Sequence, residues 1–211
     1  MLLALDSSAG TGAALVADDG TVLAERTEAD TLRHAEVVGT LIAGVLADAG
    51  ASAGDVTAVA VGVGPGPFTG LRVGMAAARA FALAAGVPVE GIVSHDAIAL
   101  AALGGILDRA DPAAPSGLIV VTDARRRERY WTRYTGLDDA GLPVRSTGPA
   151  LAKPDDVPGD APTVEDSAVS PGALGVLAVR RQVAGRPALP LDPLYLRSPD
   201  VTLSAPKRVA T

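Results

Sequence analysis

A carboxylate followed by hydroxyl side chains stands at the end of the first apolar segment of the chain. Residues 2–5 are apolar, Asp6 follows them, and Ser7 to Thr11 form a turn of small and polar residues. Backbone N–H groups in such a turn can surround a phosphate, and a carboxylate can hold a metal-bound water. Because serine and glycine are common in any turn, the same residues also fit a strand that ends in an ordinary polar turn.

A second carboxylate, that of Asp123, follows another apolar segment at 118–121 and would form the other half of a nucleotide site. Ala124 and Arg125 come next, where a glycine turn would be needed to bring backbone N–H groups close to a phosphate. The sequence therefore predicts that phosphate binding at this second position is impaired.

Metal and nucleophile chemistry have little support in the residue types. His34 and His95 each lack a second histidine three or four positions away, as a helical metal site would need. We expect each at a polar surface or an interface. The chain has no cysteine, which excludes a thiol nucleophile, and its two histidines leave few general bases for any serine. We therefore expect no catalytic residue and no metal site.

The sequence GPGPFTG at 64–70 predicts a rigid corner between a strand and a helix, because prolines restrict φ and glycines permit close backbone approach. One interpretation is a recognition surface. The other is a structural corner, with Phe68 as a hydrophobic staple and Thr69 as the N-cap. The residues singled out are Gly64, Gly66, Phe68, Thr69 and Gly70.

One basic segment stands out in a chain with a net charge of −6. Five arginines between 125 and 133 interleave with Tyr130, Trp131 and Tyr134, against the single acid Glu128. Arginines and aromatic rings suit RNA phosphates and bases. In a strand, however, alternate residues point to opposite faces. We therefore favour a half-buried strand, with Tyr130 or Trp131 in the core and the arginines in solvent.

Hydrophobic periodicity predicts the elements that carry these residues. In the first half they are strands at 2–5, 13–17, 21–27, 56–63 and 87–93, and helices at 33–48, 71–85 and 97–107. In the second half they are strands at 118–121, 129–135 and 143–148, a loop-rich stretch at 149–171 and a helix at 172–184. Each half of the chain has strands followed by helices. This repetition predicts two related α/β domains at 1–110 and 117–211, with the boundary at 111–116.

The expected helix at 71–85 has only two charged residues, Arg72 and Arg79, so it must be covered on more than one side. One side can lie on its own sheet. We expect the opposite side to be the one paved by small residues and to allow close approach of a helix from another chain. These small residues are Gly74, Ala77, Ala78 and Ala82.

Composition limits the class of protein. With 211 residues, 48% of them hydrophobic, the chain can bury a core. The longest uncharged stretch, 56–71, is too short and too interrupted by glycine and proline to span a bilayer. The first residues lack the basic segment of a signal peptide, and the absence of cysteine agrees with a reducing compartment. We expect a cytoplasmic protein.

Several segments resemble the TsaB family, also called YeaZ, of bacterial tRNA threonylcarbamoyladenosine biosynthesis proteins, in particular the actinobacterial type. The resemblance runs from about residue 2 to residue 201. The segments that carry it are LALDSSAGTGAALV, LRHAE, GVGPGPFTGLRVGMAAARAFA, VVTDARRRERYWTRY and PLYLRSPDV.

The resemblance implies an actin-like ATPase (ASKHA) fold, with two similar mixed-sheet domains flanked by helices. It also implies a degenerate paralogue of the catalytic subunit TsaD, which transfers threonylcarbamoyl to the adenosine beside the anticodon. A protein of this kind has no activity alone. It pairs with TsaD and with TsaE, a small P-loop ATPase, and meets tRNA through the complex. ATP and metal belong to the partner subunits, so no cofactor is expected here.

The family's contact with TsaD uses the first two helices, here 33–48 and 71–85, and a homodimer would use the same surface. The interface residues that the resemblance implies are His34, Val38, Leu41, Ile42, Val45, Arg72, Gly74, Ala78 and Phe81.

This sequence departs from the catalytic paralogue, which carries two histidines four residues apart. His95 matches the first of these positions and Ala99 the second, so the metal pair is broken. Asp6, Ser7 and Asp123 correspond to a vestigial nucleotide site. The stretch from 157 to 171 is shorter than in most family members. The alternatives are an autonomous actin-like ATPase or kinase and a metallopeptidase-like hydrolase.

Overall fold

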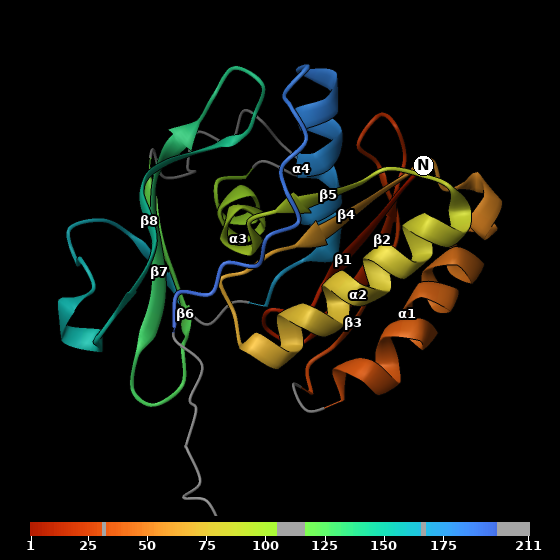
Figure 1. The fold of residues 1–211 in the computed structure, drawn as a ribbon. Coiled ribbons are helices and arrows are strands. Elements are labelled where there is room, and N and C mark those ends of the chain that lie inside the picture. The colour runs from red at the N-terminus through yellow and green to blue at the C-terminus, as the bar shows by residue number, and fades with distance from the viewer. Residues whose placement is uncertain (31–32, 105–116, 166–167, 198–211) are drawn as a thin grey trace, which may run out of the picture.

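The computed structural model describes residues 1–30, 33–104, 117–165 and 168–197 (Figure 1). The strands are β1 (Leu2–Asp6), β2 (Thr11–Val16), β3 (Val22–Glu28), β4 (Ala58–Gly62), β5 (Val89–Ile92), β6 (Leu118–Asp123), β7 (Arg129–Leu137), β8 (Pro143–Ala152) and β9 (Thr163–Glu165). The helices are α1 (His34–Asp48), α2 (Phe68–Ala85), α3 (Ser94–Ala102) and α4 (Pro171–Val183). None of the helices in the described ranges is long and apolar enough to cross a bilayer.

Some element boundaries differ from the sequence-based expectation. Helix α2 begins at Phe68 and its N-cap is Pro67, so the assignment of Thr69 as the N-cap is wrong. Proline supplies the restricted φ, here −60°, at a position where no N–H donor is needed. The stretch 149–171, expected to be loop, contains the end of β8 and all of β9. The helix expected at 97–107 begins earlier, at Ser94, and ends at Ala102, with Leu103 as its C-cap. The domain boundary expected at 111–116 lies outside the described residues.

The two sheets share one pairing pattern. The first has the order β3-β2-β1-β4-β5, and the second has the order β8-β7-β6-β9. In the first, β1 pairs antiparallel with β2 and parallel with β4. In the second, β6 pairs antiparallel with β7 and parallel with β9. Both sheets are therefore mixed, and β1 and β6 are equivalent strands.

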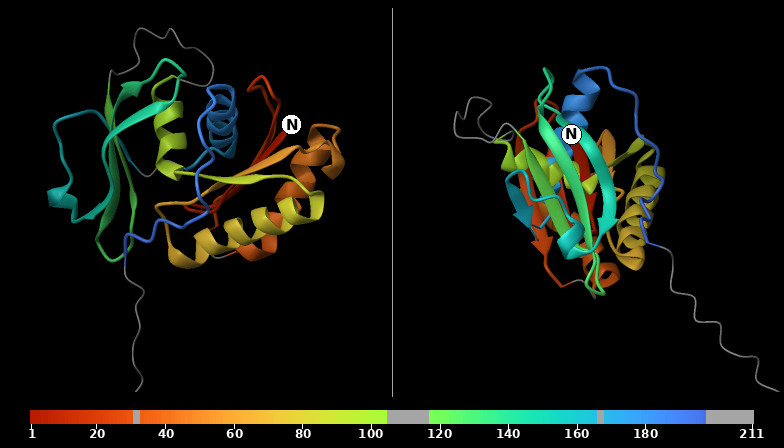
Figure 2. Two further views of the ribbon diagram at one scale, coloured as in Figure 1. Left: turned by 45° about the horizontal axis from the view of Figure 1, so that its top comes forward. Right: turned by 90° about the vertical axis from the view of Figure 1, so that its left-hand side faces the viewer.

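Helices form two of the four layers of the molecule (Figure 2). Helices α1 and α2 cover one face of the first sheet, where Leu3 and Leu5 of β1 pack with Leu71 and Val45. Helices α3 and α4 lie between the two sheets and share a core with Leu118 of β6. Because β1 is buried on both faces, the residue that follows its apolar run is held at a defined place in the interior.

The segment that follows α4 crosses the molecule as an extended strap, residues 187–197 (Figure 1). Along β5, Gly91 N donates to Leu189 O over 3.2 Å, and further along, Leu194 N donates to Val63 O over 2.8 Å. At its end, Arg197 Nη1 donates to Ala124 O over 3.2 Å. The strap thus ties the edge of the first sheet to the turn between β6 and β7.

Candidate functional site

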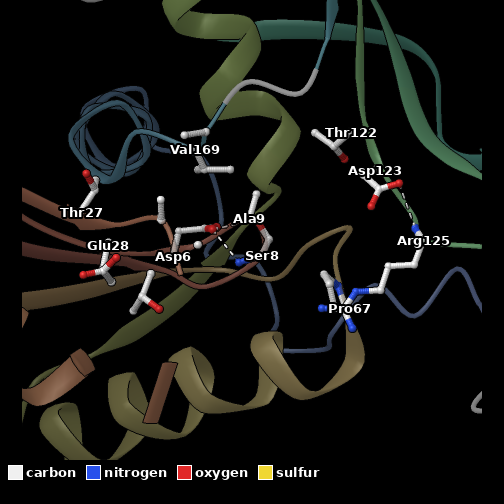
Figure 3. Close-up of a pocket in the computed structure, with 15 residues that line it drawn as sticks. Asp6, Ser8, Ala9, Thr27, Glu28, Pro67, Thr122, Asp123, Arg125 and Val169 are labelled. Carbon is white, nitrogen blue, oxygen red and sulfur yellow. Dashed lines mark hydrogen bonds between the residues drawn. The ribbon is translucent and has the colours of Figure 1, made fainter. Parts of the chain in front are cut away.

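A cavity of about 420 Å³ opens where the ends of β1 and β6 face each other (Figure 3). We call it the Asp6 cavity. Asp6 and Asp123, assigned from sequence to two halves of one site, both line it. Ser7, the third residue assigned to that site, is fully buried and is not part of the lining. The volume of the Asp6 cavity is within the usual range for a small-molecule site.

Three hydrogen bonds within the chain hold the Asp6 carboxylate. Ser8 N and Ser8 Oγ donate to Asp6 Oδ1 over 2.8 Å and 2.7 Å, and Ser94 Oγ donates to Oδ2 over 2.6 Å. Burial raises the pKa of Asp6 above its ordinary value, although the serine donors oppose this. A Cβ atom at Gly62 would lie 1.8 Å from Asp6 Oδ2. The carboxylate therefore anchors the β1–β2 turn to the start of α3.

The corner at 64–70, which we call the glycine corner, packs so closely against the β1–β2 turn that their backbones are in contact. Ser7 Oγ donates to Gly70 O over 2.7 Å and accepts from Gly74 N over 3.1 Å. A Cβ atom at Gly66 would lie 2.8 Å from Ser8 Cβ, and one at Gly70 would lie 2.6 Å from Ser7 O. These contacts account for the glycines by packing within the chain, as the structural-corner interpretation requires.

Phe68 is not the hydrophobic staple that the sequence suggested. It is the first residue of α2, and its ring lies 4.5 Å from that of Tyr195 in the strap. The guanidinium of Arg72 lies 3.7 Å from the centre of the Phe68 ring, and its Nε donates to Tyr195 Oη over 2.9 Å. Tyr195 was missed from the sequence because nothing local ties it to a helix more than a hundred residues earlier.

The second half of the Asp6 cavity has a different turn. Asp123 is exposed, and its Oδ1 accepts a hydrogen bond from Arg125 N over 3.2 Å. Arg125, Arg126 and Arg127 have positive φ values of 62°, 52° and 62°. Left-handed backbone is disfavoured for residues other than glycine. The side chain of Arg125 lies at the rim of the cavity near Pro67 (Figure 3).

His95 is buried and clamped between two threonines, so the expectation of a surface or interface position is wrong. Its Nδ1 lies 2.8 Å from Thr132 Oγ1 and its Nε2 lies 2.9 Å from Thr122 Oγ1. Burial lowers the pKa of His95 to about 3, so the ring is neutral at physiological pH. In the described part of the chain, no group of three or more His, Cys, Asp or Glu residues is placed to hold a metal ion.

His34 is also buried, and its Nδ1 lies 2.7 Å from Thr11 Oγ1. Burial lowers the pKa of His34 below its ordinary value. Among the residues assigned to the interface, Val45, Gly74 and Ala78 are buried as well. Val38, Leu41, Ile42 and Phe81 are half-buried, and Arg72 is exposed.

The small-residue side of α2 faces its own sheet, which corrects the expectation that it faces outward. Gly74, Ala78 and Ala82 are buried. A Cβ atom at Gly74 would lie 2.3 Å from Ser7 Oγ, so the glycine makes room for this serine. The outer side of α2 carries Ala76 and Leu83 instead, and Leu83 is 85% exposed.

The basic and aromatic segment forms a half-buried strand, β7, from Arg129 onward, and Arg125 to Arg127 lie in the turn that precedes it. Tyr130 and Tyr134 are buried, and Tyr134 Oη donates to Asp96 Oδ1 over 2.7 Å. Trp131 is half-buried, and Arg133 forms an ion pair with Asp160. Two of the three aromatic rings therefore belong to the core and cannot stack on bases.

Comparison with known proteins agrees with this architecture. The family model TsaD, described as tRNA N6-adenosine threonylcarbamoyltransferase, matches residues 21–169. The tRNA threonylcarbamoyladenosine biosynthesis protein TsaB of Escherichia coli is 31% identical over 154 residues, which are 73% of this chain and 63% of that protein. An uncharacterized protein of Mycobacterium tuberculosis is 42% identical over 217 residues, which are 94% of this chain and 92% of that protein.

Two solved structures from Pseudomonas aeruginosa have the same fold. YeaZ superposes with a TM-score of 0.74 at 25% identity, over 92% of this chain and 99% of that chain. A protein described as similar to peptidase YeaZ gives a TM-score of 0.77 at 24% identity, over 93% and 99% of the two chains. The mixed sheets and their helices are those of the actin-like ASKHA-type fold that the resemblance implied. The chain therefore belongs to the TsaD family and is of the TsaB (YeaZ) type.

Proposed function

We propose that this chain serves tRNA threonylcarbamoyladenosine biosynthesis as a non-catalytic partner subunit. Its membership of the TsaD family and its likeness to TsaB support the pathway. Its own site residues support the non-catalytic role, because Asp6 is engaged by two serines and the β6–β7 turn has no glycine. The protein would act in the cytoplasm and need no cofactor of its own.

The environment of His95 is the observation that carries this proposal. The resemblance assigns two metal-binding histidines to the catalytic paralogue at the positions of His95 and Ala99. Here both nitrogens of His95 are within hydrogen-bond distance of threonine hydroxyls, and Ala99 is fully buried. A ring with both nitrogens engaged has no lone pair to give to a metal. His95 joins α3 to the second sheet and does not perform transfer.

The partner surface that we propose is the outer side of α1 and α2. This surface includes the half-buried Leu41, Ile42 and Phe81, and the exposed Arg72 and Leu83. A TsaD-type catalytic subunit would bind there, and a second copy of the chain would take its place when that subunit is missing. A TsaE-type ATPase would join the pair, and tRNA would bind to the assembled complex.

The direct test is reconstitution with TsaD-type and TsaE-type chains from the same source. We expect co-purification of the chains, and tRNA modification that stops when this chain is left out. Alone, it should neither modify tRNA nor hydrolyse ATP. ATP hydrolysis by the isolated chain that is abolished by Asp6→Ala would contradict the proposal and favour an autonomous ATPase.

A further inference from the structure

A second cavity, of about 290 Å³, is lined by residues of α3, α4 and β8 and shares no lining residue with the Asp6 cavity. Three arginines from separate elements line it: Arg145 of β8, Arg181 of α4 and Arg186 at the start of the segment after α4. We call it the arginine cavity. The rest of its wall consists of apolar residues, among them Ile92, Leu142, Leu177 and Leu189, and of two acids, Asp96 and Asp138.

The three guanidinium groups have more donors than the surrounding residues use. Arg145 Nε lies 3.3 Å from Asp96 Oδ1, and Arg186 Nη2 donates to Asp138 Oδ2 over 3.1 Å. Arg181 Nη2 donates to Pro187 O over 2.7 Å. A guanidinium carries five N–H donors, so these contacts leave most of them free for another acceptor.

Arg181 Nε is the clearest case. It is buried and has no hydrogen-bond partner, and it is the only such side-chain atom found among the described residues. Glu90 Oε2 is 3.8 Å away, which is too far for a hydrogen bond. A buried donor of a charged group without a hydrogen bond is costly, and the ion pair with Glu90 at 3.8 Å offsets only part of that cost.

The nearby carboxylates are held by other donors. Asp96 Oδ1 accepts from Tyr134 Oη over 2.7 Å, and Asp138 Oδ1 accepts from Ala140 N and Leu142 N, each over 2.9 Å. Glu90 Oε1 accepts from Gln182 Nε2 over 3.4 Å. Three acids therefore balance the charge of the three arginines, but they cannot satisfy all of the guanidinium donors.

We propose that the arginine cavity binds a small oxyanion, a carboxylate or a phosphate group carried on a compact apolar body. Oxyanions accept several hydrogen bonds at once, and arginine suits them because its donors are arranged in a planar fork. The volume admits only a small molecule, since one water occupies about 30 Å³ of liquid.

The test is titration of the full chain with sodium sulfate, inorganic phosphate and isovalerate. Binding is measured by calorimetry and by the NMR chemical shifts of the lining residues. We expect saturable binding. Tighter binding of isovalerate than of sulfate would identify a carboxylate with an apolar body, and the reverse order would identify a phosphate group. Both orders support an oxyanion site, whereas no saturable binding of any probe overturns it.

Variants make the test specific to the cavity. Arg181→Gln should weaken binding roughly tenfold or more, since a hydrogen bond between charged groups is lost. Arg186→Gln removes a half-exposed side chain and keeps the test valid if Arg181→Gln fails to fold. Arg33→Gln is the control, because Arg33 is exposed and pairs with Glu36. Equal binding by folded Arg186→Gln and wild-type chains would overturn the proposal.

Discussion

The turns after β1 and β6 occupy equivalent places in their sheets but are built from different residues. After β1, Asp6 is buried and accepts three hydrogen bonds, and glycines let the neighbouring corner approach. After β6, Asp123 is exposed, and three arginines occupy left-handed backbone. The first turn is held by the interior of the protein, whereas the second is open to solvent.

This difference shows what each half contributes. The first turn connects β1, the glycine corner and α3, so a change there should disturb several elements at once. The second turn contacts the strap through Arg197, whose Nη2 lies 3.4 Å from Glu128 Oε2. The two side chains are only partly buried, 25% and 31% accessible, so this ion pair adds less to stability than the buried hydrogen bonds of Asp6. Stability is therefore expected to depend strongly on the first turn and weakly on the second.

The largest expected effect is that of Gly62→Ala. The added Cβ atom would lie 1.8 Å from Asp6 Oδ2 and 2.7 Å from Ser94 Oγ, so the carboxylate must move and lose its donors. We expect the free energy of unfolding to fall by about 3 kcal/mol or more, at the upper end for overpacking in a core. Urea denaturation measures it.

Gly159→Ala is the matched control for Gly62→Ala. A Cβ atom at Gly159 would meet nothing within 4 Å, and its backbone does not need a positive φ. The stability of this variant should stay within about 0.5 kcal/mol of wild type. If Gly62→Ala is no less stable than Gly159→Ala, the first turn does not carry the role assigned to it.

His95 and Asp96 at the start of α3 join the two halves, and they predict an unusual pH dependence. Burial raises the pKa of Asp96 to about 6 and lowers the pKa of His95 to about 3. Between pH 4 and 6 the folded chain holds a proton on Asp96 that the unfolded chain has lost. The contribution of Asp96 to the free energy of unfolding therefore falls as pH rises. His95 is neutral in the folded chain and protonated in the unfolded chain over this range. The contribution of His95 to the free energy of unfolding therefore rises with pH.

The opposite effects of pH on the contributions of Asp96 and His95 should nearly cancel in the wild-type chain. A variant at either residue separates them. In Asp96→Asn the free energy of unfolding should rise with pH between 4 and 6 by up to about 1.4 kcal/mol per pH unit relative to wild type. In His95→Gln it should fall with pH over the same range. Chemical denaturation at several pH values measures both, and parallel profiles for the three proteins would rule out this pair as the cause.

Sequence reasoning predicted the fold well because its signals were local. Apolar runs predicted β1 and β4, helical spacing predicted α1 and α4, and the resemblance around the glycine corner supplied the family. The place of His95 between two threonines was not predictable, because those threonines come from strands far along the chain. The strap was missed for the same reason, since Leu189 and Leu194 pair with Gly91 and Val63, which lie 98 and 131 positions earlier.

The orientation of α2 shows how a correct local reading can give a wrong surface. Small residues permit close approach of any neighbour, and sequence alone does not say which one. In the structure the neighbour of Gly74 is Ser7 Oγ of the same chain. Charged substitutions at Gly74 or Ala78 would therefore damage the fold, and a test of the partner surface needs the outer side of α2.

The helices extend the comparison between the two halves, because α4 is buried over most of its length and α2 has an open side. Leu83→Asp should weaken association with a TsaD-type chain, or self-association, by roughly tenfold if it lies within the contact. Val183→Asp on α4 is the control, because Val183 is 80% exposed. Light scattering and co-purification measure both, and a loss seen only in Val183→Asp would place the interface on α4.

The smallest expected effect is that of Arg127→Gly in the second turn. Arg127 is exposed and its φ is 62°, a value that glycine adopts without the steric cost of a Cβ atom. We expect the variant to be as stable as wild type or more stable, by up to about 1 kcal/mol, because the greater freedom of glycine in the unfolded chain offsets part of the strain that is relieved. In the first turn, by contrast, added side chains are the damaging change. Thermal unfolding of Arg127→Gly measures the difference, and a clear loss of stability would mean that the Arg127 side chain supports the turn through contacts of its own.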